Sequence, residues 1–171
     1  MDGLEFTRLG LNDYRDEEFD CGNEDLNEFF FKDSKDNCKE LLAITYAWIL
    51  DGKTIAFFSV SNDSITTQDV DNFNKFRKRL PWGKRYKTMP SVKIGRFAVH
   101  KDFKKMKHGS TIMDFIKIWF VKGNKTGCRF IIVDALKESL PFYEKNGFSF
   151  LSNKDEKDLT RLMYFDLKVI N

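Results

Sequence analysis

A strand-to-helix junction in the middle of the chain decides the fold, and it reads Phe97-Ala98-Val99-His100-Lys101-Asp102-Phe103-Lys104-Lys105-Met106-Lys107-His108-Gly109-Ser110. Val92–His100 is typical of a buried strand, and the helix after the loop places Ile112, Phe115, Ile116, Trp119 and Phe120 on one face. The first N–H groups of a helix lack an acceptor within the helix, and the helix dipole favours negative charge there. With four lysines in the loop, the junction indicates either a site for a phosphorylated ligand or a solvated loop.

The flanking segments predict a mixed sheet with helices on both faces. Further strands are expected at Leu4–Leu9, Ile44–Leu50, Thr54–Asn62, Phe130–Ala135, Phe148–Leu151 and Leu162–Val169. Further helices are expected after the N-cap Asn23, over Val70–Leu80, and after Ser139, with Gly147 just beyond the end of the last one. Asp51-Gly52 is a hairpin signal and predicts antiparallel pairing, whereas the strand–helix–strand order of the second half implies parallel pairing.

Composition sets outer limits on the class of protein. The chain has 171 residues, of which 42% are hydrophobic and 32% charged, and this suits one globular domain. Three widely spaced cysteines and two histidines predict neither a disulfide framework nor a metal site. The longest uncharged apolar run, Leu41 to Leu50, has ten residues, against the roughly 20 of a membrane-spanning helix. The first residues lack a signal-peptide pattern, so we expect a cytoplasmic protein with no membrane segment.

Charge is strongly segregated along the chain. Between Lys75 and Lys107 there are thirteen basic residues and one acid, a net charge of +12 in a chain whose total is +3. Between Leu11 and Glu40 there are eleven acids against four basic residues. Such segregation of charge gives information about binding partners rather than about the fold. The basic stretch suits the phosphates of a ligand or of RNA, the acidic one suits a cationic acceptor, and either could be a solvated surface.

Four motifs resemble the GNAT N-acetyltransferase superfamily, in the expected order and over nearly the whole chain. Ile94–Val99 is similar to the central strand of the family, and Lys104–Phe120 is similar to its pyrophosphate-binding loop and helix. Phe142-Tyr143-Glu144-Lys145-Asn146-Gly147-Phe148 closely resembles the C-terminal signature. Phe19-Asp20-Cys21-Gly22-Asn23-Glu24-Asp25-Leu26-Asn27-Glu28-Phe29 is similar to the start of a subgroup that includes toxins acetylating aminoacyl-tRNA. Lys107 stands where the loop usually has its first glycine, and Leu136 replaces a common asparagine.

The resemblance implies an α/β (α+β) fold of one domain, residues 1–171, with a mixed, mostly antiparallel sheet and splayed central strands. It implies acetyl-CoA as co-substrate and no metal. The pantetheine would run beside Phe97, Ala98 and Val99, and a backbone N–H near Val99 would stabilise the oxyanion. The pyrophosphate would meet the N–H groups of the loop, which are those of Lys104, Lys105, Met106, Lys107, His108, Gly109, Ser110 and Thr111.

Tyr143 is the catalytic residue that the resemblance implies, as the acid that protonates the departing CoA thiolate. A phenol with a pKa near ~10 keeps its proton at neutral pH, as that role requires. The alternative for Tyr143 is a packed core aromatic. The general base is not identified: Asp134, Glu138 or a water chain could serve, and His100 and His108 are weaker candidates, because each of these side chains suits a structural or solvent-facing place as well.

Three hypotheses follow. The first is an acetyl-CoA-dependent N-acetyltransferase that acts by direct attack of a primary amine on the thioester, with a small molecule or a peptide as acceptor. The second makes the acceptor the amino group of an aminoacyl-tRNA. The third is a catalytically silent CoA-binding module, suggested by Lys107 and Leu136. A homodimer is left open.

Overall fold

The computed structural model describes residues 4–78, 80–81, 83–106, 108–123 and 126–171. The chain forms two compact units. The first unit comprises residues 1–61 and 94–112, and the second comprises residues 62–93 and 113–171. The predicted site residue Lys107 lies outside the described residues.

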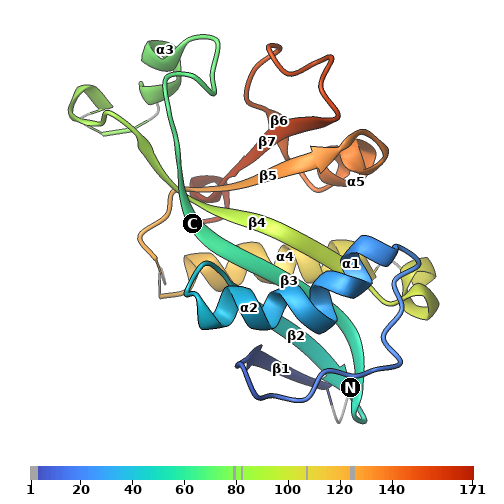
Figure 1. Ribbon diagram of the computed structural model, residues 1–171. Helices are drawn as coiled ribbons and strands as arrows, with labels where there is room; N and C mark the ends of the chain where they lie inside the picture. Colours follow the sequence, from blue (N-terminus) through green and yellow to red (C-terminus); the bar gives the residue numbers. More distant parts are fainter. Residues whose placement is uncertain (1–3, 79, 82, 107, 124–125) are drawn as a thin grey trace. The chain divides into compact units, whose positions relative to one another are not determined.

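Seven strands form a sheet in the order β1-β2-β3-β4-β5-β7-β6 (Figure 1). Their bounds are β1 Leu4–Leu9, β2 Ile44–Leu50, β3 Lys53–Ile65, β4 Met89–Val99, β5 Phe130–Leu136, β6 Ser149–Phe150 and β7 Thr160–Asp166. The pairs β1–β2, β2–β3, β5–β7 and β6–β7 are antiparallel, and β4–β5 is parallel. The mixed, mostly antiparallel sheet of an α/β (α+β) fold is therefore confirmed. The β4–β5 ladder joins Ser91–Lys93 to Phe130–Ile132, the short ladder expected of splayed strands.

The helices are short apart from the one after the junction. They are α1 Glu24–Glu28, α2 Ser34–Lys39, α3 Phe73–Arg77, α4 His108–Val121 and α5 Leu140–Lys145. A π-helical turn, Phe29–Asp33, joins α1 to α2, and 3₁₀ helices cover Gly83–Arg85, Lys101–Met106, Lys137–Ser139 and Leu167–Ile170. Within the described ranges, every helix is too short or too polar to cross a membrane.

The core of the first unit lies between α1–α2 and the strands β2 and β3, which these helices cross in Figure 1. The π-helical turn lets the consecutive residues Phe29 and Phe30 both be buried. Phe30 stacks on Phe57 of β3 with ring centroids 4.9 Å apart. Ser34 Oγ donates to the Phe30 carbonyl at 2.7 Å and accepts from Arg15 Nε at 3.3 Å, so the polar groups beneath the turn are paired.

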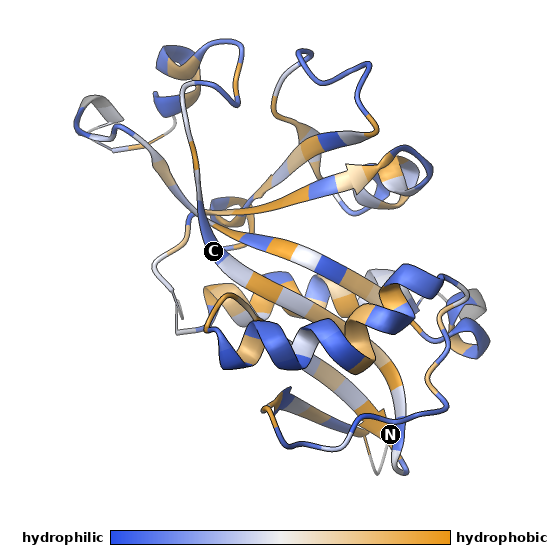
Figure 2. Cartoon of the chain, in the orientation of Figure 1, coloured by the Kyte–Doolittle hydropathy of each residue, from blue (hydrophilic) through white to orange (hydrophobic). Residues whose placement is uncertain are grey.

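The core of the second unit is built on β5, which Figure 2 shows as mostly hydrophobic and in which Asp134 is the charged residue. Phe130 and Ile132 of β5 pack with Phe76 of α3 and Met89 of β4. The rings of Phe76 and Phe130 are 5.2 Å apart. A buried strand flanked by aromatic side chains is the arrangement that the continuous apolar run predicts.

Three elements are shorter than predicted. Helix α3 begins at Phe73 rather than Val70, because the Asn72 side chain caps it by accepting the Lys75 N–H at 2.9 Å. Val70 packs in the core of the second unit instead. The last strand ends at Asp166 rather than Val169, since a 3₁₀ helix begins there. β6 covers Ser149–Phe150 instead of Phe148–Leu151.

Candidate active site

The end of β4 carries the three residues expected beside the pantetheine. Phe97 is half-buried, whereas Ala98 and Val99 are buried. The N–H of His100 donates to the Ile55 carbonyl of β3 at 2.8 Å. Because the backbone groups of successive residues in an antiparallel strand point to opposite edges, the N–H of Val99 points away from β3. That direction is the one required for a donor to a ligand lying along β4.

The expected pyrophosphate loop is a 3₁₀ helix, Lys101–Met106, and not an open loop. It begins with hydrogen bonds to His100, whose carbonyl accepts the Phe103 N–H at 2.9 Å and whose Nδ1 accepts the Asp102 N–H at 3.2 Å. Lys104 is exposed at its surface. The backbones of Lys105 and Met106 complete this turn.

The first turn of α4 consists of His108, Gly109, Ser110 and Thr111. The N-terminus of an α-helix attracts anions through the helix dipole. A helix start at this point of the chain is what the sequence predicts, and the pyrophosphate contact stays a prediction.

The N-terminal motif, Phe19–Phe29, forms a network of hydrogen bonds that reaches the strand-to-helix junction at Lys101. Asn23 Oδ1 accepts the Leu26 N–H at 3.0 Å and caps α1, as predicted. Asn27 Oδ1 accepts the Cys21 N–H at 3.0 Å, while Asn27 Nδ2 donates to Asp20 Oδ1 at 2.9 Å. Asp20 Oδ2 in turn accepts from Lys101 Nζ at 2.8 Å. The N-terminal motif therefore binds Lys101, the first residue of the 3₁₀ helix.

Tyr143 lies in α5, at the C-terminal signature. Its ring makes edge contacts with Phe142 and Phe148 at 5.2 and 5.3 Å between centroids. Burial raises the pKa of Tyr143 to about 12, so the hydroxyl is protonated at neutral pH. The helix begins after Ser139, as predicted; Ser139 occupies the N-cap position, but its side chain makes no capping hydrogen bond, and a 3₁₀ turn precedes the helix.

The expected site residues divide between the two units. Phe97–Val99, Lys104–Met106 and His108–Thr111 belong to the first unit, and Tyr143 belongs to the second. The first group comprises a strand end, a 3₁₀ helix and a helix start, and the second is a half-buried tyrosine in α5; their roles stay predictions.

Three of the four candidate bases make contacts elsewhere, and the fourth is exposed. Asp134 of β5 forms an ion pair with Lys93 of β4. His100 accepts a hydrogen bond from the backbone of the junction, and His108 makes an edge contact with Phe103. Glu138 is exposed in the 3₁₀ turn before α5. These observations favour the structural alternative for His100 and Asp134.

The buried face of α4 differs from the predicted one. Phe115, on the predicted apolar face, is 37% exposed, whereas Lys117, which is not part of that face, is 5% exposed. Lys117 Nζ donates to the Asn146 carbonyl at 2.7 Å and to Asp114 Oδ1 at 3.0 Å. The helical spacing of apolar residues could not predict that Lys117 is buried, because it assigns a lysine to the solvent-facing side of a helix.

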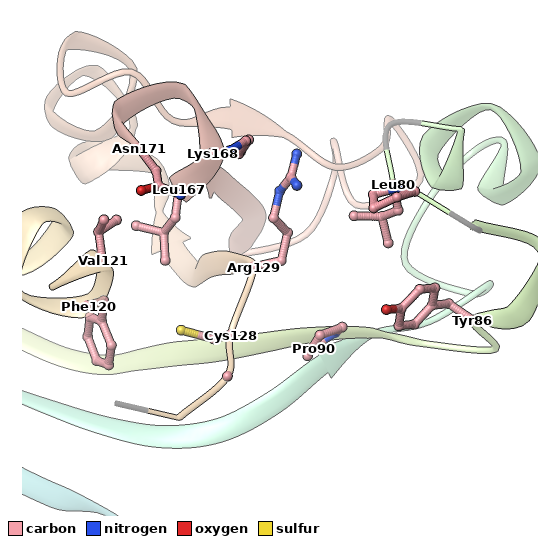
Figure 3. A pocket seen from close by; sticks show the side chains of 12 residues that line it. Leu80, Tyr86, Pro90, Phe120, Val121, Cys128, Arg129, Leu167, Lys168 and Asn171 are labelled. Carbon is pink, nitrogen blue, oxygen red and sulfur yellow. The ribbon is translucent and has the colours of Figure 1, made fainter. Parts of the chain in front are cut away.

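A cavity of about 320 Å³ lies in the second unit, away from the expected residues (Figure 3). Arg129 and Lys168 contribute its cationic side chains. Arg129 is neutralised by Asp166, to which its Nη2 donates at 2.9 Å. Among the described residues that line this cavity there is no predicted site residue.

The described part of the chain holds no group of three His, Cys, Asp or Glu side chains that could bind a metal ion. Cys21, Cys38 and Cys128 are free thiols, of which Cys21 and Cys128 are buried and Cys38 is half-buried. Burial raises the pKa of the Cys21 and Cys128 thiols.

A mixed sheet with a short central parallel ladder, a cationic strand-to-helix junction and a half-buried tyrosine are the features that the motifs predict for a CoA-dependent acyltransferase. The acetyltransferase (GNAT) domain model matches residues 45–150, and the chain belongs to that family. It is an N-acetyltransferase that uses acetyl-CoA as co-substrate, as the motifs predict.

Solved structures share the fold. AtaT complexed with acetyl-methionyl-tRNAfMet is 21% identical, with a TM-score of 0.79 over 98% of this chain and 96% of that one. A tyrosine-to-phenylalanine mutant of KacT is 20% identical, with a TM-score of 0.79 over 99% and 98%. AtaTR bound with acetyl-CoA is 21% identical, with a TM-score of 0.73 over 99% and 97%. No curated protein sequence matches the chain.

Proposed function

We propose that this enzyme acetylates the amino group of an aminoacyl-tRNA, with Tyr143 as general acid. Acetyl-CoA would bind along Phe97–Val99 and at the junction from Lys104 to Thr111. The likeness to AtaT, solved with acetyl-methionyl-tRNAfMet, supports the acceptor, and the likeness to AtaTR bound with acetyl-CoA supports the donor. The tyrosine mutation in the KacT structure supports the choice of a tyrosine as the residue to test.

A basic surface in the second unit is the observation that carries the acceptor proposal. It consists of Lys75, Lys78, Arg85 and Lys87, all exposed. Within the described ranges none of the four forms an ion pair. Tyr86, between the last two, is 39% exposed. Unpaired cations attract a phosphate backbone and an exposed aromatic ring can stack on a base, so the basic surface favours RNA over a small amine.

The acidic stretch supports the cationic-acceptor alternative less well, because two of its carboxylates serve the fold. Asp16 Oδ2 accepts the N–H of Thr54 at 2.7 Å. Asp20 is bonded to Lys101 and Asn27. Their charge is therefore already partnered within the first unit.

The chemistry follows from the two halves of the site. Acetyl-CoA supplies the acetyl group as a thioester. The neutral amine of the acceptor attacks the carbonyl carbon, so that a C–N bond forms while the C–S bond breaks. The N–H of Val99 stabilises the negative charge on the carbonyl oxygen. The hydroxyl of Tyr143 gives its proton to the departing sulfur; the attacking nitrogen loses its extra proton to solvent, and Tyr143 regains one from solvent, so that the amide and the free CoA thiol are the only products.

An acceptor comparison tests the proposal. Wild-type protein with acetyl-CoA is offered aminoacyl-tRNA, the same tRNA without its amino acid, the free amino acid, a polyamine and a peptide, and CoA release is followed. We expect release with aminoacyl-tRNA and only background release with deacylated tRNA. Acetylation of the peptide or the polyamine at an equal or higher kcat/KM would overturn the aminoacyl-tRNA proposal. Such an acceptor places the reaction in the cytoplasm, and a homodimer stays a prediction.

A further inference from the structure

A buried lysine in α4 has two oxygen partners and lies close to an aromatic ring. Lys117 is 5% exposed. Its Nζ donates to the Asn146 carbonyl at 2.7 Å and to Asp114 Oδ1 at 3.0 Å, and lies 4.6 Å from the centroid of the Phe165 ring. An ammonium group has three donors, of which two have oxygen acceptors, and the Phe165 ring is the aromatic face nearest to the group.

Asn146 belongs to the turn that closes α5 around Tyr143. The N–H of Asn146 lies 3.1 Å from the carbonyls of both Phe142 and Tyr143. The side-chain amide of Asn146 donates to the Phe142 carbonyl at 2.8 Å. The N–H of Phe148 donates to the Tyr143 carbonyl at 3.0 Å. The Tyr143 backbone is therefore held by the same turn that Lys117 holds through the Asn146 carbonyl.

Stability alone does not explain a lysine at this position. Moving an ammonium group out of water costs free energy, and apolar residues of similar volume often replace buried ion pairs without loss of stability. The carboxylate of Asp114 is 64% exposed, so it contributes little as an ion-pair partner. The distinctive contact is the short hydrogen bond to Asn146, which fixes a direction as well as a distance.

We propose that Lys117 is a positioning residue for Tyr143: by bonding to the Asn146 carbonyl it fixes the end of α5 and hence the direction of the Tyr143 hydroxyl. The inference rests on the proposed role of Tyr143 as general acid. Lys117 itself touches neither the acceptor nor acetyl-CoA in this account. Its removal lowers the rate of thiolate protonation and leaves the binding of acetyl-CoA unchanged.

A double-mutant cycle separates positioning from a purely structural role. CoA thiol release is measured at saturating acetyl-CoA for the wild type, Lys117→Met, Tyr143→Phe and the double variant. Aminoacyl-tRNA is the acceptor, and the hydrolysis of acetyl-CoA by water is measured in parallel because its leaving group is the same. Asp114→Asn is the matched control, since it removes the exposed partner of Lys117 and keeps the bond to Asn146. Lys117→Gln, which retains a donor, replaces Lys117→Met if the latter does not fold.

We expect Lys117→Met to lower kcat by about 10- to 100-fold, the range of a small misplacement of a reacting group, with KM for acetyl-CoA unchanged. In the Tyr143→Phe background the same substitution should change kcat less than about twofold, and Asp114→Asn should resemble the wild type. An equal loss in both backgrounds, or no loss in either, overturns the positioning role of Lys117. If Tyr143→Phe alone leaves kcat unchanged in both reactions, the general-acid role fails and the inference fails with it. If the enzyme hydrolyses acetyl-CoA but does not acetylate aminoacyl-tRNA, the double-mutant cycle can still be measured on hydrolysis. That result would contradict only the proposed acceptor.

Discussion

Lys101 and Asp20 are joined twice, by their side chains and by their backbones. Lys101 Nζ lies 2.8 Å from Asp20 Oδ2, and the Lys101 N–H donates to the Asp20 carbonyl at 2.8 Å. The hydrogen bond from Lys101, followed by those from Asn27 and Gly22, holds the pKa of Asp20 below its usual range. The N-terminal motif and the start of the candidate pyrophosphate site therefore depend on one ionised carboxylate.

Replacing Asp20 by Asn should weaken acetyl-CoA binding. Lys101 loses its charged partner, and the 3₁₀ helix that begins at Lys101 loses its side-chain bond to the N-terminal motif. We expect Kd to rise by a factor of about 1.4 to 5, the range of an exposed ion pair, measured by calorimetric titration. Glu28→Gln is the matched control, since it removes the exposed Glu28–Lys32 pair of 2.9 Å in the same unit. Equal affinities of the two variants would contradict the link between Asp20 and the cofactor site.

The pH dependence of Tyr143 should lie far above neutrality. Its folded-state pKa is raised to about 12 by burial, above the ordinary value of ~10. The associated stabilisation is fully present below pH ~10 and is lost as the pH rises through the folded pKa. The phenolate absorbance of the wild type minus that of Tyr143→Phe should stay flat through pH ~10 and rise only near ~12. A difference band with a midpoint near ~10 would show that Tyr143 is solvated.

The basic surface should determine affinity for the acceptor and not for acetyl-CoA. We expect Lys78→Glu and Lys87→Glu each to raise KM for aminoacyl-tRNA and to reduce the slope of log KM against log salt by about 1, as for one lost phosphate contact. Lys157→Glu makes the same charge change at another exposed position of the second unit. If Lys157→Glu has the same effect, net charge rather than this surface is responsible.

Gly147 ends the turn of Tyr143 in the left-handed region, at φ +79°, and an added Cβ would lie 3.2 Å from Phe165 Cε2. Gly127 has φ +67° with nothing within 4 Å of an added Cβ. Backbone strain alone costs about 1–2 kcal/mol in either place. Gly147→Ala should therefore lower the free energy of unfolding by more than Gly127→Ala, measured by urea denaturation. If both variants lose the same free energy of unfolding, the Phe165 ring moves away from the added methyl group at no cost.

Local patterns predicted the elements whose signal lies within a few residues. The Asp51-Gly52 hairpin, the Asn23 cap and the strand at Phe130 all appear in the structure. The helix predicted over Val70–Leu80 is too long, since propensity alone does not reveal that Asn72 caps the chain two residues beyond a core valine.

Contacts between distant residues were beyond such patterns. Asp20 and Lys101 are 81 residues apart in sequence, and Lys117 and Asn146 are 29 apart. Periodicity assigns a lysine to solvent because it cannot foresee a carbonyl, a carboxylate and an aromatic ring meeting one ammonium group. The raised pKa of Tyr143 likewise depends on burial, which only the folded chain supplies.

Acetyl transfer to aminoacyl-tRNA by wild type, Tyr143→Phe and Tyr164→Phe tests the central claim most directly. The aminoacyl adenosine released from the tRNA is weighed by mass spectrometry after incubation with acetyl-CoA. We predict one added acetyl group with the wild type and with Tyr164→Phe, and a rate about 10²- to 10⁴-fold lower with Tyr143→Phe, the contribution of a general acid. An unmodified aminoacyl adenosine with the wild-type enzyme would contradict the acceptor, and an unchanged rate with Tyr143→Phe would contradict the mechanism.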